Sequence, residues 1–539
     1  MVSLLILLLP ALPLLALALW VFMYKARPRL ALGLVLGLMA VLFILWVWLA
    51  ATVPTGDGIG WSCRMMLFES PLAMRVDPLS ALLGLTVSGM ALLAVVFWSA
   101  NGCGEQTALL LWSLASLQLV LTADHPLLLW TGWTALPVAL LIALRGSTVL
   151  ALGVASAALG NVALVFGLLR LQALADRGAP IAVALSLAVA GHLGLYTLFS
   201  ERSGRQTARA GHVLALGLLG MLPSALYLLL RFWPYWVGDG MVGTVFQWAA
   251  VAAMWVALLR AALDDRALSI LSGWWMIEAL LLMALLPHGD PGLIAYQAVT
   301  LILSGGAALW SLWMLGGAVQ ADRAGAAIVS ALSAGLFFLV ELGVPWSAGF
   351  GGRVTILGQV AMDRGYLLLV LACLATFLVA RLLSGQVLQM VRGGSTLQGN
   401  DAPLWKCWLA WLPPLAGLGA VIALSAGRRG LLAWLGLGAP LWQIDLSPLG
   451  RALAWAPTLL LALGVLTAWS AERKRDRWRV DGSAQSTRAA RSLRSRVDSD
   501  AWERLRHALM ALDPTELPAE ILACIVCLIL VIVMLWGIG

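Results

Sequence analysis

Long apolar runs dominate this chain and constrain its fold more than any other feature. Of its 539 residues, 62% are hydrophobic and only 11% carry a charge. The runs are roughly 18–25 residues long, which is the length of an α-helix that crosses a hydrocarbon core about 30 Å thick. They are continuous and rich in Leu and Ala, whereas membrane strands need alternating polarity and a closed barrel. We therefore expect an all-α polytopic membrane protein.

Roughly 14–16 of these runs are expected to be transmembrane helices. The candidate spans are residues 3–24, 30–52, 79–99, 107–123, 126–144, 147–170, 181–200, 210–232, 243–263, 267–287, 292–316, 326–345, 366–391, 408–426, 430–443, 451–470 and 519–537. The first run lacks a basic region before it and leads directly into another run. We expect it to be a retained helix and not a signal peptide.

Polar sequence between the runs is short, so no separate soluble domain is expected. We divide the chain into N-terminal transmembrane helices, a transmembrane core, C-terminal transmembrane helices, a basic amphipathic segment and a final helix, at residues 1–106, 107–391, 392–470, 471–518 and 519–539. Apolar sequence is interrupted within 181–232 and within 326–391. Interrupted helices about 150 residues apart indicate an internal repeat, and broken backbone at membrane depth lines cavities or protein contacts.

The net charge of +8 is explained by topology. Basic residues gather in a few short polar loops and in the 471–518 segment, as the positive-inside rule expects, so no nucleic-acid partner is predicted. We expect a multi-pass protein of the inner (cytoplasmic) membrane. The amphipathic 471–518 segment is expected either to lie on the lipid bilayer or to bind a neighbouring subunit. No motif for a cofactor, a metal ion or a catalytic group is present, and the six Cys are scattered.

Five short segments follow one another in a pattern that is similar to a known family. Residues 77–80 resemble a D-x-L-S motif, and 136–144 resemble a V-P-M-x-F-L-I-A-L helix. Residues 208–213 fall at a V-S-A-L-I-H-A motif, 264–272 resemble D-I-K-R-V-L-A-Y-S, and 342–353 resemble L-G-L-P followed by N-F-V-G-E/K. In this order and spacing the chain resembles the antiporter-like L, M and N subunits of respiratory complex I and the large subunits of Mrp-type antiporters, as a divergent member.

The resemblance implies a chain of buried charges that carries protons at mid-membrane height. A buried group can hold a proton only where burial and neighbours set its pKa, and ionisable residues inside a membrane are usually functional. Here the family's glutamate position falls near residues 131–132, which carry no carboxylate. Its broken-helix lysine aligns with His192, a family histidine position matches His212, and the terminal charge is Arg353.

Five residues are therefore candidates for the proton pathway. His192 and His212 are proton relays or hydrogen-bonded core histidines, with both readings open. Glu278 and Glu341 are relays or members of structural ion pairs. Arg353 does not release its proton at any working pH, so it can only tune a neighbour or pair with Glu341.

These features predict a proton- or cation-translocating, antiporter-like subunit of a larger membrane complex. It would be a non-catalytic subunit, and a proton-translocating NADH:quinone oxidoreductase-like complex is one such assembly. Two alternatives stay open. One is a membrane subunit that energises inorganic-carbon uptake with a carbonic-anhydrase-like partner. The other is a scaffold that no longer transports ions, which the missing glutamate and lysines favour.

Overall fold

The structure is a computed structural model that describes a large part of the first 305 residues and a few residues beyond them. The described residues are 2–53, 58–67, 70–100, 104–143, 150–173, 181, 183–189, 191–192, 216–232, 247–248, 250–251, 254, 267–285, 294–303, 305, 370, 372–378, 380–381, 384, 463, 466–467 and 470. Most of the predicted interruption at 326–391, and nearly all of the three units from 392 to the end, lie outside them.

Most of the described helices coincide with the predicted apolar runs to within a few residues, whereas α1 and α2 divide the run 3–24 and α10 covers only the last part of the run 210–232. They are α1 (Val2–Leu5), α2 (Leu8–Met23), α3 (Pro28–Thr52), α4 (Pro78–Ala100), α5 (Gly104–Thr122), α6 (Pro126–Ala143), α7 (Leu150–Ala173), α10 (Leu222–Arg231) and α13 (Ala267–Leu285). Pro28, Pro78 and Pro126 begin α3, α4 and α6. Proline suits this position because its missing N–H has no helical partner to lose.

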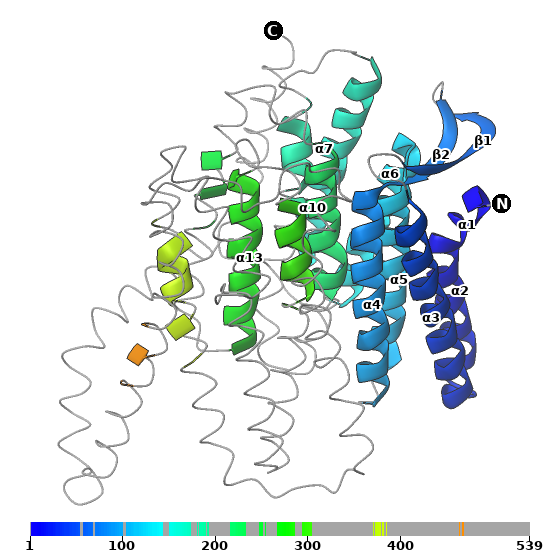
Figure 1. Cartoon of the computed structure of the whole chain (residues 1–539), viewed down its shortest axis with the longest axis horizontal. Coiled ribbons are helices and arrows are strands. Elements are labelled where there is room, and N and C mark those ends of the chain that lie inside the picture. Colours follow the sequence, from blue (N-terminus) through cyan, green and yellow to red (C-terminus); the bar gives the residue numbers. More distant parts are fainter. Residues whose placement is uncertain are drawn as a thin grey trace, which may run out of the picture.

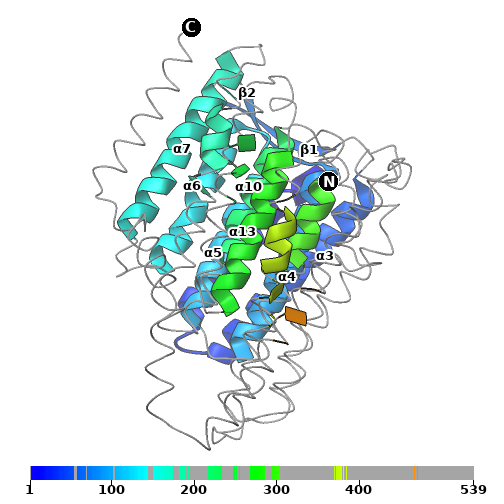
Figure 2. The same ribbon diagram turned by 90° about the vertical axis from the view of Figure 1, so that its left-hand side faces the viewer.

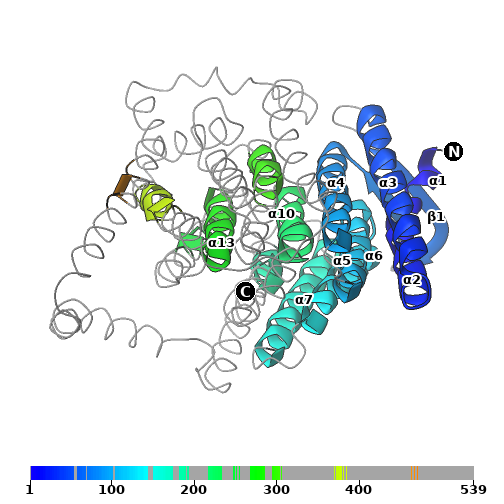
Figure 3. The same ribbon diagram turned by 90° about the horizontal axis from the view of Figure 1, so that it is seen from below.

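The long helices lie side by side, and an end-on view shows them as a row of packed cylinders (Figure 1 and Figure 3). The helix α5 is central, since it packs against α2, α4, α6 and α10. The pair α2 and α3 lies at one edge of the row, and α13 lies on the other side of α10 (Figure 3). In the perpendicular view α6 and α7 run beside one another (Figure 2). The core is thus formed by helix-to-helix contacts.

The outer faces of the edge helices are apolar. Phe22 of α2 is 82% exposed, Ile44 of α3 is 63% exposed and Val162 of α7 is 59% exposed. Within the described residues, Pro28–Thr52 and Pro78–Val96 are each long and apolar enough to span a membrane by themselves, and several shorter apolar helices accompany them. Exposed apolar surface of this kind is rare on soluble monomers and suits contact with lipid.

A two-stranded hairpin is the element that the sequence did not predict. Strands β1 (Ile59–Leu67) and β2 (Ser70–Val76) pair antiparallel within the polar gap between α3 and α4. Figure 1 shows the hairpin at the end of the bundle near the N-terminus. The backbone N–H of Asp124 donates to the carbonyl of Ala73 at 3.1 Å, so β2 is fixed to the turn between α5 and α6.

A π-helix at Gly217–Met221 runs directly into α10. The cause is close by, because Pro223 has no N–H to donate and its ring crowds the carbonyl four residues earlier. A wider turn relieves that crowding, and such turns are frequent at functional sites. The interruption predicted within 181–232 is the polar stretch 200–205, which lies outside the described residues, so the irregular helix at 217–221 is a separate feature that the sequence did not predict.

Candidate functional site

The helical residues between 181 and 192 pack against α7 in the antiparallel sense. A Cβ added to Gly167 would lie 3.3 Å from the Cβ of Ala184, and one added to Gly191 would lie 2.9 Å from the Cα of Gly160. The Gly160–Gly191 contact is therefore backbone against backbone. Small residues of this kind let two membrane helices approach closely, and here the close approach fixes the residue that follows, His192.

His192 lies against the face of Trp133, which belongs to α6. The two rings are stacked with centroids 3.6 Å apart and an angle of 13° between their planes. Both side chains are completely buried. A Cβ added to Gly160 would lie 3.7 Å from the Cδ2 atom of His192, so α7 also touches the imidazole. Three segments thus enclose the ring, namely α6, α7 and the 181–192 helix.

Polar side chains of α6 and α7 form hydrogen bonds between the segments that carry the two rings. The hydroxyl of Ser156 donates to the carbonyl of Gly191 at 2.8 Å. The hydroxyl of Thr134 lies 2.7 Å from the carbonyl of Trp130 and 3.1 Å from Oδ1 of Asn161. A hydroxyl can donate one bond only, so one of these two is its main acceptor. These contacts connect α6 to α7 and α7 to the residue that precedes His192.

The two nitrogens of the imidazole are buried without a hydrogen-bond partner among the described residues, and so is the indole Nε1 of Trp133. Leaving a buried polar group unpaired costs about 1–3 kcal/mol. A buried group that costs this much is retained mainly where it has a function. An imidazole can take up and release a proton near neutral pH. His192 is thus a completely buried ionisable side chain with two ring nitrogens unpaired among the described residues, and its role as a relay stays a prediction.

Glu278 lies in a second buried polar region. It sits in α13 with 1% of its surface exposed. A Cβ added to Gly305 would lie 2.5 Å from Nε1 of Trp275, so α13 packs against the segment that follows residue 294. Gln297 and Thr300 of that segment are buried too. No hydrogen bond in the described part of the chain joins Glu278 to His192, and its place in a pathway stays a prediction.

The other predicted pathway residues, His212, Glu341 and Arg353, lie outside the described residues. In the part that is described, no group of three or more His, Cys, Asp or Glu side chains could hold a metal ion.

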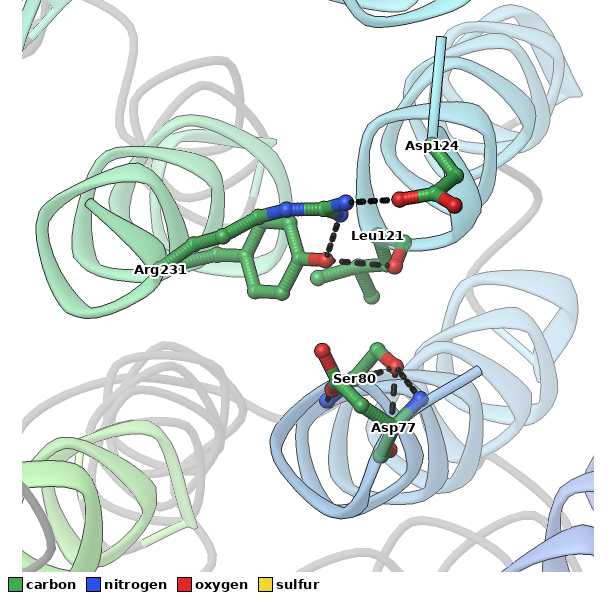
Figure 4. A network of polar contacts seen from close by, with 6 residues as sticks. Asp77, Ser80, Leu121, Asp124 and Arg231 are labelled. Carbon is green, nitrogen blue, oxygen red and sulfur yellow. Dashed lines mark hydrogen bonds and ion pairs between the residues drawn. The ribbon is translucent and has the colours of Figure 1, made fainter. Parts of the chain in front are cut away.

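A charged cluster that the sequence did not single out lies at the end of the bundle that carries the hairpin. The guanidinium of Arg231, the last residue of α10, donates to Oδ1 of Asp124 at 2.8 Å and to the hydroxyl of Tyr227 (Figure 4). The hydroxyl of Tyr227 donates to the carbonyl of Leu121 at 2.9 Å. That carbonyl is in the last turn of α5, where carbonyls have no helical partner. The cluster therefore ties α10 to the turn between α5 and α6.

Asp77 faces this cluster from the start of α4 (Figure 4). Its Oδ1 accepts from the N–H of Ser80 at 2.7 Å, and its own N–H donates to the hydroxyl of Ser80 at 2.8 Å. This reciprocal pair caps the helix. The D-x-L-S resemblance therefore corresponds to a helix cap, and the charge of Asp77 interacts electrostatically with Arg231. Sequence alone gave Arg231 no partner because Asp124 is far from it along the chain.

Replacing Arg231 with methionine is expected to destabilise the chain by about 1–3 kcal/mol, because the variant loses its bonds to Asp124 and Tyr227. The destabilisation should lie toward the low end of this range, since the Arg231 and Asp124 side chains are 20% and 39% exposed and water screens the pair. Thermal unfolding in detergent measures the loss. Asp124→Asn combined with Arg231→Met should cost less than the sum of the two single variants. Strict additivity would show that the ion pair contributes nothing.

The fold matches two solved membrane assemblies. One chain of an Mrp complex from Dietzia sp. DQ12-45-1b superposes with a TM-score of 0.65 at 18% identity, covering 93% of this chain and 62% of that one. One chain of respiratory complex I from Thermus thermophilus with bound NADH superposes with a TM-score of 0.57 at 18% identity, covering 85% of this chain and 100% of that one. The chain shares its fold with these two chains.

These matches confirm the predicted fold class and the predicted structural resemblance. No family model matches the sequence, and no curated protein matches it. The chain spans about 62% of the length of the Dietzia chain that it matches. At this level of identity the likeness concerns the fold, so activity and partners must be argued from the residues.

Proposed function

We propose that this chain is a proton-translocating subunit of a larger membrane complex and that His192 is its relay residue. The observation that carries the proposal is the burial of His192 within an antiporter-like fold, with both ring nitrogens free of described partners. An ionisable group inside a membrane bundle costs several kcal/mol and is functional by default. Imidazole is the side chain whose ordinary pKa suits proton exchange near neutral pH.

The resemblance places a glutamate near Thr131 and Gly132, and the surroundings of these two residues support a proton path that differs from the family pattern. Thr131 is exposed, and its hydroxyl donates to the carbonyl of Leu127 at 2.7 Å. A Cβ added to Gly132 would lie 2.9 Å from the carbonyl oxygen of Ser116 in α5. A carboxylate at 132 would therefore push α6 away from α5. A relay in this chain has to work without a carboxylate at these two positions.

The lack of a carboxylate at Thr131 and Gly132 also favours a second candidate, a scaffold subunit that has lost transport. Under this alternative, the bundle keeps the antiporter-like helices, lacks the pathway carboxylate, and has the role of holding neighbouring subunits together. The inorganic-carbon alternative stays a prediction, because nothing in the described residues bears on its partner.

Proton flux separates transport from scaffolding. The intact assembly, purified through a tag on this chain, is reconstituted in liposomes that contain a pH-sensitive dye, and a potassium gradient with valinomycin imposes a membrane potential. Proton translocation predicts a dye response that protein-free liposomes lack and that a protonophore collapses. An assembly that holds all its subunits and gives no response above protein-free liposomes would contradict transport and favour the scaffold. A sodium-sensitive dye in a parallel sample tests whether the ion is a proton.

A further inference from the structure

We infer that Trp133 is the positioning residue of the His192 relay and that its indole face takes the place of a carboxylate as the partner of the protonated ring. The inference rests on the proposed function, since it concerns the same site. The family resemblance did not indicate Trp133. Its indole face explains how a proton can be held where α6 provides no carboxylate at Thr131 or Gly132.

The geometry of the stack carries the inference. The two rings are nearly parallel at 13° with centroids 3.6 Å apart, and each is completely buried. A cation within about 6 Å of the face of an indole ring is attracted by the negative charge of that face, most strongly where water is excluded. A protonated His192 would lie well within this distance. The indole therefore stabilises the charged form of the imidazole over the neutral form.

The packing of α6 explains why Trp133 has this role. Gly132 allows α6 to contact α5, as an added Cβ would lie 3.0 Å from the backbone N of Val120. Thr131 faces outward. The next residue along the helix, Trp133, is the one whose side chain meets His192. The close contact between Gly160 and Gly191 holds the imidazole on that face.

The chemistry at this site is a reversible protonation. A proton from the entry side of the path adds to the lone pair of one imidazole nitrogen, and the ring becomes a cation of charge +1. The indole stays neutral, and no other bond forms or breaks. Loss of a proton from the ring to the exit side restores the neutral imidazole. Because the indole covers a face of the ring, exchange takes place at the ring edge, where the two nitrogens lie.

The test compares potential-driven proton flux of the reconstituted assembly in four variants. Trp133→Leu removes the aromatic face and is expected to lower the initial rate roughly tenfold. Trp133→Phe keeps an aromatic face and is expected to restore the rate to within about twofold of wild type. Trp130→Leu is the matched control, since Trp130 is on the same helix and 38% exposed, and it should transport as wild type does. His192→Gln removes the proposed relay residue and is expected to reduce the proton flux.

The outcomes separate the inference from the proposed function. Lost flux in His192→Gln with normal flux in Trp133→Leu overturns the inference and leaves the proposed function standing. Equal losses of proton flux in Trp133→Leu and Trp133→Phe overturn the inference too. The rate would then depend on how well the cavity is filled and not on an aromatic face. Normal flux in His192→Gln overturns the proposed function, and the inference with it. If Trp133→Leu does not assemble, Trp133→Met, which fills more of the space, takes its place in each comparison.

Discussion

Replacing His192 with glutamine is expected to reduce potential-driven proton flux more than tenfold while the assembly remains intact. Glutamine has a polar amide that can occupy the buried space, but it cannot take up a proton near neutral pH, whereas imidazole can. His192 is fully buried against Trp133 and lies close to Gly160 of α7. The rate is measured with a trapped pH dye after a potential is imposed, and subunit content is checked by size-exclusion chromatography.

His125→Gln provides the matched histidine control. The Nδ1 atom of His125 accepts from the N–H of Leu127 at 3.1 Å at the beginning of α6, so this histidine has a structural contact. Loss of that contact should cost about 1 kcal/mol and leave proton flux near the wild-type rate. Wild-type flux in His192→Gln would show that protons do not pass through His192. Equal losses in both histidine variants would point to general damage to the bundle.

The helices could be predicted from the sequence because a membrane leaves the backbone few choices. Lipid offers no hydrogen bonds, so an apolar run of sufficient length has to satisfy its backbone groups within the segment. This is why the predicted runs at 30–52, 126–144 and 267–287 agree closely with α3, α6 and α13. The hairpin at 59–76 lies in a polar gap, where water competes for the backbone. Residues 59–65 do alternate apolar and polar side chains, which is typical of a strand, but this short pattern is easily missed beside the long apolar runs.

The candidate site could be predicted only in part. An ionisable residue inside an apolar run is visible in the sequence, and His192 and Glu278 were identified in that way. Their surroundings depend on contacts between helices that are distant along the chain. The stack of Trp133 on His192 and the bond from Arg231 to Asp124 both join residues of different helices. No periodicity within one helix encodes such contacts, because they arise from the way in which the helices pack.

The glutamate position shows how a departure in sequence becomes a departure in geometry. The glutamate that the resemblance implies falls near Thr131 and Gly132, and neither residue carries a carboxylate. In this chain Gly132 instead allows α5 and α6 to touch, with an added Cβ only 2.9 Å from the carbonyl of Ser116. The missing carboxylate is thus built into the packing of the bundle. A transport path in this chain would have to be chemically different from the family pattern at that point.

Substituting leucine for Gly191 is expected to have the largest effect on stability, a loss of about 3 kcal/mol. An added Cβ would lie 2.9 Å from the Cα of Gly160, 2.9 Å from the carbonyl oxygen of Ser156 and 3.0 Å from the backbone N of Gly160. All three atoms are backbone atoms of α7, so no side chain can rotate away. The two helices would have to separate, and the bond from the Ser156 hydroxyl to the Gly191 carbonyl would break.

The effect of Gly191→Leu should also reach the candidate site, because the residue that follows is His192 and its stack on Trp133 depends on the same close approach. We expect a lower unfolding temperature together with lost proton flux. Gly33→Leu is the matched control, since nothing lies within 4 Å of a Cβ at Gly33 on α3, and the exposed leucine should leave both values unchanged. If Gly191→Leu unfolds at the wild-type temperature, α7 and the 181–192 helix cannot be as close as the structure places them. If it unfolds early and yet transports normally, the position of His192 does not matter for flux.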